Sequence, residues 1–87
     1  MQIQTTEIEQ GIRSFLIEEF LFGRSEALTD DVPLLGNVID SQGVIELVSF
    51  VQQRFSIEVA DDDVTTDNFA SVKSVVAFIE KKLGSKA

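Results

Sequence analysis

The apolar residues of the sequence recur with helical spacing in three separate stretches. In the first stretch they are Ile8, Ile12, Phe15, Leu16 and Phe20. Residues three or four positions apart share one face of an α-helix, so this spacing predicts a helix with a buried stripe. Thr6-x-x-Glu9 is typical of a capping box, and Gly23 is a typical residue at which a helix stops. We therefore expect a first helix between Thr6 and Gly23.

Two further stretches show the same spacing nearer the C-terminus. In the second stretch the apolar face consists of Leu47, Val48, Val51 and Phe55. In the last stretch the corresponding residues are Val72, Val75, Val76, Ile79 and Leu83. Asp40 or Ser41 is placed to cap the second of these helices. Ser71 is placed to cap the last helix, and Gly84 to end it.

Between the first two helices, residues 24–40 lack the helical period, and Pro33 stops any helix that enters from either side. We expect an ordered loop whose apolar residues pack against the helices. These residues are Leu28, Val32, Leu34, Leu35, Val38 and Ile39. So long a loop is uncommon in a small domain and indicates a functional site at one of its ends. Later in the chain, residues 56–59 are expected to be loop, and a short helix is predicted over about residues 66–69.

These elements predict an all-α fold, a small four-helix bundle with three long helices, a short third helix and a long ordered loop between helices 1 and 2. A chain of 87 residues supports one hydrophobic core, so we expect a single domain over residues 1–87. Its core is expected to span about residues 5–83 and to be followed by a short flexible tail. Five of the seven Phe residues are expected in or beside this core: Phe15, Phe50, Phe55, Phe69 and Phe78.

The amino-acid inventory excludes most enzyme classes. The chain has no Cys and no His, which removes thiolate zinc sites, Cys nucleophiles and serine–histidine triads. The acidic segment that starts at Asp61 lacks the glycine and the final glutamate of an EF-hand, so no metal site is expected. Glu18 and Glu19 are adjacent in sequence and diverge on a helix, which makes them solvated surface rather than a catalytic pair. We therefore predict no catalytic residues.

Charge and hydropathy restrict the partners. Fifteen Asp and Glu against seven Lys and Arg give a net charge of −8, which repels phosphate backbones and favours basic protein surfaces. Nucleic acid is therefore not an expected partner. No apolar run reaches the roughly 18 residues of a membrane span. These features predict a cytoplasmic protein without membrane insertion.

The string that begins with Asp40 and Ser41 is the most informative part of the chain, because it follows the long loop and starts a helix. A serine in the first turn of a helix is accessible, and the unpaired N–H groups there favour an attached anion. Ser41 has no His to activate it, so an outside enzyme would have to modify it. Taken alone, the pair is also compatible with an ordinary helix cap.

The order and spacing of these elements resemble the acyl and peptidyl carrier proteins over nearly the whole chain. The centre of the resemblance is Asp40-Ser41 with Glu46-Leu47, which is similar to the family's Asp-Ser-Leu-x-x-x-Glu-Leu attachment motif. The resemblance implies that Ser41 carries 4′-phosphopantetheine, whose thiol holds the cargo as a thioester. It also implies that Asp40 assists the phosphopantetheinyl transferase and its metal ion, and that the carrier itself is not catalytic.

The resemblance further implies that the second helix binds partner enzymes. The expected partner face consists of Gln42, Ile45, Glu46, Ser49 and Gln52. Ile45 is predicted to face outward as an apolar anchor, and Gly43 to permit close approach by the arm or a partner. Fatty-acid carriers have Leu after the serine and acidic residues along this helix, whereas here the helix is nearly uncharged.

This departure predicts a specialised carrier, loaded with an amino acid, D-alanine or an unusual acyl group by an activating ligase. Downstream acyltransferases or synthases complete the expected partners, and a monomer suits a carrier that visits several enzymes. Two alternatives stay open: a housekeeping carrier of type II fatty-acid synthesis, and an unmodified acidic helical adaptor.

Overall fold

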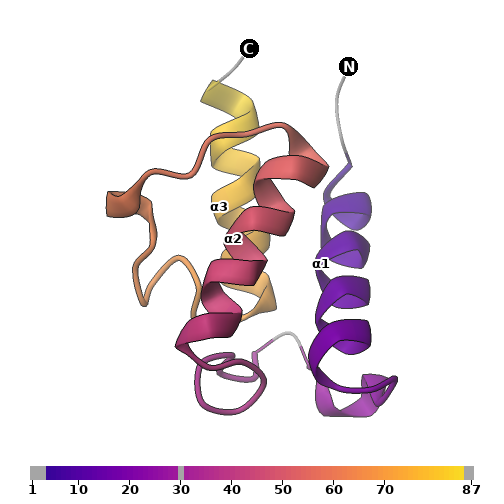
Figure 1. Cartoon of the computed structure of the whole chain (residues 1–87). Coiled ribbons are helices and arrows are strands. Elements are labelled where there is room, and N and C mark those ends of the chain that lie inside the picture. The colour runs from indigo at the N-terminus through magenta and orange to yellow at the C-terminus, as the bar shows by residue number, and fades with distance from the viewer. Residues whose placement is uncertain (1–3, 30, 86–87) are drawn as a thin grey trace.

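The computed structural model describes residues 4–29 and 31–85, and over these residues the chain forms three α-helices joined by two long connecting segments (Figure 1). The helices are α1 (Thr5–Phe20), α2 (Ser41–Phe55) and α3 (Val72–Ser85). Two 3-10 turns, η1 (Ser25–Ala27) and η2 (Asp61–Asp63), lie in the connecting segments. The prediction of an all-α fold with a long ordered loop before the second helix is confirmed.

The start of α1 differs from the predicted capping box. The N-cap of α1 is Gln4, and its side chain makes no cap hydrogen bond, so Thr6 lies inside the first turn. The hydroxyl of Thr5 donates to the carboxylate of Glu80 on α3. The capping-box prediction is therefore wrong, because the start of α1 is held by α3 and not by a local cap. At the other end the predicted stop is confirmed, since the chain leaves the helix just before Gly23, which has a φ of 87°.

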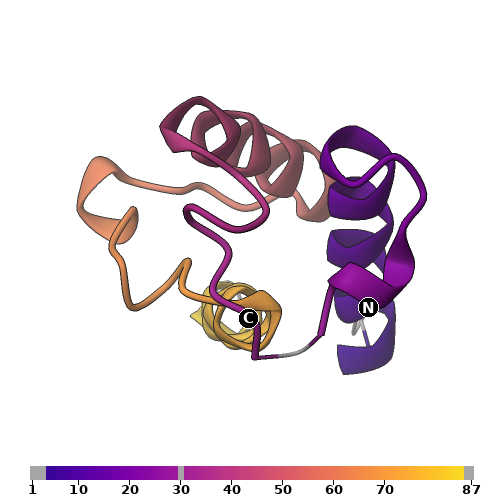
Figure 2. The ribbon, with the colours of Figure 1, turned by 90° about the horizontal axis from the view of Figure 1, so that it is seen from below.

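The core is formed by the inward faces of the three helices and by the first connecting segment, residues 21–40. The fully buried helix residues are Ile8, Ile12, Leu16, Leu47, Val51, Val72, Val75 and Ile79. Leu28, Leu34 and Ile39 of the connecting segment are also buried, as the loop prediction required. Leu35, which was also expected to pack inward, is 54% exposed. It lies at a sharp turn before Gly36, where the preceding residue, Leu34, points into the core. Figure 2 shows this segment crossing the end of the bundle between α3 and α2.

The second connecting segment, residues 56–71, contains no helix at residues 66–69, where one was predicted. Those residues form a turn, and the short helical element is η2, a few residues earlier. Side chains explain the difference. The Thr65 hydroxyl accepts the amide of Asn68 at 3.1 Å, and the Asn68 side chain donates to the carbonyl of Asp63 at 2.8 Å. These bonds close a turn before a helix can start.

Helix α3 begins as predicted and ends later than predicted. The amide of Ser74 donates to the hydroxyl of Ser71 at 3.2 Å, which confirms Ser71 as the cap. Gly84 does not end the helix, because α3 continues through Ser85. A glycine costs a helix stability without forbidding it, and nothing lies within 4 Å of a Cβ at Gly84. Residues 86–87 of the predicted tail lie outside the described residues.

Candidate functional site

Ser41 is the first residue of α2 and is exposed, directly behind the helix cap. Of the two residues considered as the cap, the structure uses Asp40. The Asp40 carboxylate oxygen Oδ1 accepts the amide of Gly43 at 2.8 Å, and the Asp40 carbonyl accepts the amide of Val44 at 3.0 Å. The Ser41 hydroxyl is therefore left out of the cap, at the surface of the molecule.

The backbone at this end of α2 is suited to hold an anion. The cap occupies the amide of Gly43, while the amides of Ser41 and Gln42 precede any carbonyl within the helix that could accept them. The positive end of the helix dipole lies at the same place. A phosphodiester on the Ser41 hydroxyl would lie against these groups, so the residues present fit a phosphate-linked arm.

The turn before Ser41 is closed by hydrogen bonds, which places the serine on a fixed support. The carbonyl of Leu34 accepts the amides of Val38 at 2.8 Å and Ile39 at 2.9 Å, and the amide of Gly36 donates back to the carbonyl of Ile39 at 2.8 Å. The amide of Leu34 donates to the carbonyl of Ala70 at 2.8 Å, which ties this turn to the start of α3. The long loop therefore ends in a rigid element immediately before the candidate site.

Gly43 serves a packing role inside the protein. Gly43 is buried, and a Cβ at this position would lie 2.8 Å from Cβ of Ile39 and 3.1 Å from Cε1 of Phe20. The groups that approach Gly43 closely are Ile39 of the preceding loop and Phe20 of α1, and not an arm or a partner. The expectation that Gly43 admits a partner is therefore wrong.

The expected partner face of α2 is only partly free. Gln42, Glu46 and Ser49 are exposed, and Ile45 is 64% exposed, as predicted. Gln52 differs, because its side-chain oxygen accepts the amide of Val59 at 2.9 Å and so holds the second connecting segment. Partner binding by this face stays a prediction, and Gln52 has a structural task within the chain.

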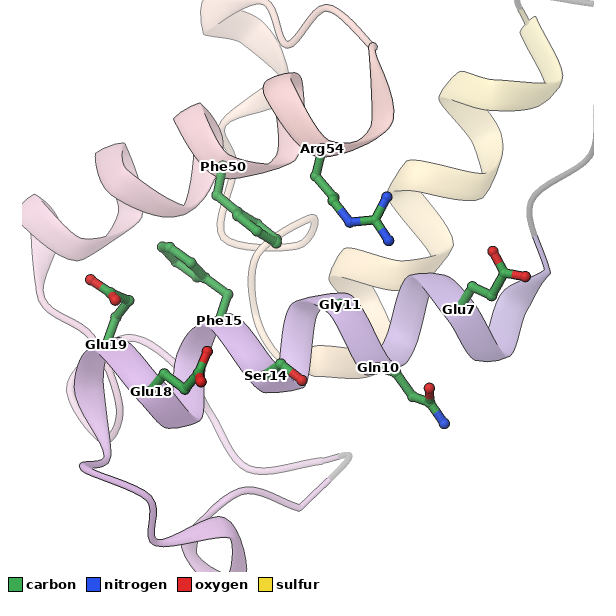
Figure 3. A pocket seen from close by; sticks show the side chains of 9 residues that line it. All are labelled: Glu7, Gln10, Gly11, Ser14, Phe15, Glu18, Glu19, Phe50 and Arg54. Carbon is green, nitrogen blue, oxygen red and sulfur yellow. The ribbon is translucent and has the colours of Figure 1, made fainter.

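A groove between α1 and α2 is the part of this surface that sequence reasoning missed (Figure 3). The groove has a volume of about 500 Å³. It is lined by Glu7, Gln10, Gly11, Ser14, Phe15, Glu18, Glu19, Phe50 and Arg54. The rings of Phe15 and Phe50 stack across it, with centroids 4.3 Å apart and planes 15° from parallel. The helical spacing of carboxylates on α1 was visible in the sequence, but which helix faces them was not.

Away from Ser41, one ion pair shapes the electrostatics of the second connecting segment. Lys82 Nζ lies 2.7 Å from Asp63 Oδ2. The hydrogen bond from Lys82 lowers the pKa of Asp63 below its ordinary value, and the amide of Ala60, 3.0 Å from the same oxygen, lowers it further. Within residues 4–29 and 31–85, no group of three or more His, Cys, Asp or Glu residues is arranged to hold a metal ion. No helix of this part of the chain is long and apolar enough to cross a membrane.

Comparison with known proteins gives a consistent set of relatives, although no protein-family profile matches the chain. The chain is 35% identical over 78 residues to the acyl carrier protein of Akkermansia muciniphila, covering 88% of this chain and 94% of the relative. It is 28% identical over 75 residues to the probable acyl carrier protein PigG of a Serratia species, covering 85% and 86% of the two chains. The structure is similar to the solution NMR structure of a holo acyl carrier protein from Nitrosomonas europaea. The TM-score is 0.73 and the sequence identity 30%, with 88% of this chain and 95% of that chain covered.

Proposed function

Since the chain belongs to the acyl carrier protein family, we propose that Ser41 is the residue to which its 4′-phosphopantetheine is attached. Acyl carrier proteins are not catalytic; the terminal thiol of the prosthetic group holds the acyl cargo as a thioester. The observation that carries the assignment is the position of Ser41. It is the exposed first residue of α2, behind a cap that does not use its hydroxyl.

The chemistry of attachment divides between this chain and the transferase. The Ser41 oxygen forms a phosphodiester with the pantetheine phosphate of coenzyme A, and adenosine 3′,5′-bisphosphate leaves. We assign the base that takes the hydroxyl proton to the transferase, because the chain contains no His and Oδ1 of the neighbouring Asp40 is bound to the amide of Gly43. The first-turn amides of α2 would then stabilise the phosphate charge.

We propose two roles for Asp40, one in the helix cap and one toward the transferase. Its Oδ1 is bound to the amide of Gly43, which fixes the carboxylate at the helix start. The residue is exposed, so its second oxygen can reach the transferase and the metal ion that accompanies coenzyme A. A fixed carboxylate beside the modified hydroxyl positions that ion with little loss of conformational entropy on binding.

Within the acyl carrier function, a specialised pathway is supported by the charge of α2. Gln42, Ser49 and Gln53 are exposed and uncharged, which leaves Glu46 as the one carboxylate among the exposed residues of this helix. Because interfacial charge discriminates between partners, an enzyme that reads a row of carboxylates on this helix is a poor match. We assign the carrier to an activating ligase for an aminoacyl, D-alanyl or unusual acyl group, followed by acyltransferases or synthases. We further propose that it works as a cytoplasmic monomer.

The test of the attachment site is the intact mass of the protein before and after incubation with coenzyme A, magnesium and a broad-specificity phosphopantetheinyl transferase. The expected result is a gain of one phosphopantetheinyl group in the native chain and none in Ser41→Ala. Ser25→Ala is the control, because it removes another exposed hydroxyl outside the expected partner face and should be modified like the native chain. Labelling of Ser41→Ala would contradict the assignment. A folded native chain that two transferases leave unmodified would favour an adaptor that carries no arm.

The pathway is tested on the modified protein with a panel of activating ligases. A mass gain of one aminoacyl or unusual acyl group from one ligase supports the specialised role. Loading by a malonyl transferase of fatty-acid synthesis alone would assign the chain to housekeeping synthesis.

A further inference from the structure

Two glycines lie in the contact between α1 and α2. Gly43 is in the first turn of α2, and a Cβ there would lie 3.1 Å from Cε1 of Phe20, the last residue of α1. Gly11 is in α1, and a Cβ there would lie 3.4 Å from Cζ of Phe55, the last residue of α2. The two helices therefore run antiparallel (Figure 1), and the terminal Phe of each helix packs on a glycine of the other.

An aromatic row of four Phe rings connects these two glycine contacts. Phe20 and Phe15 of α1 meet edge to face, with ring centroids 5.9 Å apart and planes at 72°. Phe50 and Phe55 of α2 meet in the same way, at 6.4 Å and 87°. The stack of Phe15 on Phe50, seen in Figure 3, joins the two pairs. The ring of Phe20 is thus supported by the aromatic row on one side and lies against the first turn of α2 on the other.

The first turn of α2 needs support from outside the helix. Glycine is a weak helix former, and the N–H groups of a first turn have no carbonyl partner within the helix. Ser41 and the residue after it are exposed, so Gly43 is the first buried residue of α2. Three groups fix Gly43: the carboxylate of Asp40, the side chain of Ile39 and the ring of Phe20. The position of Ser41 therefore depends on contacts made two residues further along the chain.

We propose that Phe20 is a positioning residue for the modification of Ser41. Asp40 and Ile39 belong to the segment that leads into Ser41, whereas Phe20 ties the first turn of α2 to another helix. Its ring acts through Gly43 and keeps this turn helical, so that the Ser41 hydroxyl is presented to the transferase in one place. A frayed turn would be competent for only part of the time, and the apparent affinity for the enzyme falls by that fraction. This inference rests on the proposed modification of Ser41.

The test compares Phe20→Leu with Phe15→Leu. Both are half-buried residues of α1 in the aromatic row, and leucine keeps an apolar side chain at either position. Leucine does not reach as far as Cε1, so Phe20→Leu removes the contact with Gly43, whereas the ring of Phe15 stacks on α2 only at Phe50. With coenzyme A saturating, the KM of the transferase for the carrier should rise about threefold in Phe20→Leu, as expected if the turn is ordered for about a third of the time. The kcat should change little, and Phe15→Leu should stay near the native KM.

Amide hydrogen exchange separates local order from global stability. The amide of Val44 donates to the carbonyl of Asp40 at 3.0 Å and exchanges when the first turn of α2 opens. In Phe20→Leu, exchange of the Val44 amide should become faster relative to the amide of Val51, which lies about two turns further along the same helix. In Phe15→Leu the ratio of the two exchange rates should stay native. A purely structural role of Phe20 would change both amides alike.

Each outcome has a distinct meaning. Equal KM values for the two variants would overturn the positioning role of Phe20 while leaving Ser41 as the attachment site. Equal acceleration of the Val44 and Val51 amides in Phe20→Leu would also overturn it, because the effect would then be a loss of global stability. A native chain that is folded and never modified would instead contradict the role of Ser41, and the positioning role with it.

Discussion

The two connecting segments of the molecule are held in place by different forces. The first, residues 21–40, is fixed mainly by burial of Leu28, Leu34 and Ile39 in the core. Hydrogen bonds to other parts of the chain support it: the guanidinium of Arg13 donates to the carbonyl of Leu28 at 2.6 Å, and the amide of Leu34 donates to the carbonyl of Ala70 at 2.8 Å. Apolar burial of this kind does not depend on the protonation of any side chain.

In the second connecting segment, residues 56–71, the buried hydrophobic residues are Ile57 and Phe69, which lie near its two ends. Between them it is held by polar contacts. The amide of Val59 is bound by Gln52, and the side chain of Asp63 by Lys82. Such contacts at the surface are individually weak and are screened by salt.

The difference indicates which part of the carrier is rigid. The first segment opens only if core residues leave the core, so the turn before Ser41 is held rigidly. The segment before α3 opens at a much lower free-energy cost, because few apolar contacts hold its middle. Substitutions should therefore change the free energy of unfolding strongly in the first segment and weakly in the second.

The largest effect is expected from Leu34→Ala. Leu34 is fully buried, so the substitution should lower the free energy of unfolding by about 2–5 kcal/mol. Val64→Ala, at an exposed position of the second segment, should change it by no more than about 0.5 kcal/mol. Urea unfolding of both variants measures the contrast, and similar values for the two would break the comparison.

A smaller loss is expected from Gly43→Ala, which tests the contact between the first segment and α2. Ile39 belongs to a closed turn and cannot move away from a new Cβ, so overpacking should cost about 1–3 kcal/mol. This exceeds the gain in helix propensity of about 1 kcal/mol. Gly84→Ala in α3 meets no neighbour and should stabilise the protein instead. Thermal unfolding should show shifts of opposite sign; stabilisation by both substitutions would show that the contact with Ile39 is unimportant.

Loss of the helix cap at the end of the first segment should lower the free energy of unfolding by less than Gly43→Ala does. Asp40→Ala removes the acceptor for the amide of Gly43 and should destabilise the protein by about 1 kcal/mol. Asp40→Asn retains a side-chain acceptor and should keep most of the stability. Both variants should be modified more slowly at Ser41, because neither has the carboxylate. Normal modification of Asp40→Asn would limit the role of Asp40 to capping.

The smallest effect is expected in the second segment, from the ion pair between Lys82 and Asp63. The pKa of Asp63 is lower in the folded chain than its ordinary value of 3.8. The contribution of the ionised Asp63 to stability is therefore complete above pH 3.8 and is lost as the pH falls through the lower pKa of the folded chain. The difference in unfolding free energy between the native chain and Lys82→Gln should shrink as the pH is lowered below about 4. A pH-independent difference would show that packing of Lys82 on Phe78, 5.8 Å from its ring centroid, matters more than the charge.

Helix faces could be predicted from the sequence because they depend on spacing within one element. Leu47, Val51 and Phe55 are buried on one side of α2, and Ile45 is exposed on the other, as the period required. The position of Ser41 at the start of a helix was predicted for the same reason, since it depends on a local helix start after a long loop, and its modification stays a prediction.

The errors at the start of α1, at Gly43 and in the groove involve contacts between different elements, whereas the turn that replaces the predicted helix at residues 66–69 has a local cause. Thr5 is bound by Glu80, so the start of α1 did not follow its local capping signal. The space that a Cβ at Gly43 would need is filled by Ile39 and by Phe20 of another helix. The groove depends on which helix faces the carboxylates of α1, and the hydrophobic period of a single helix does not contain that information.

The stack of Phe15 on Phe50 gives this protein an optical signal of its own. The chain contains seven Phe and neither Trp nor Tyr, so all of its aromatic near-ultraviolet absorption comes from phenylalanine. Stacked rings 4.3 Å apart couple their transitions, and the resulting circular dichroism depends on the separation of α1 and α2. Near-ultraviolet spectra of the isolated carrier, before and after its arm is attached and loaded, would therefore report whether cargo separates the two helices.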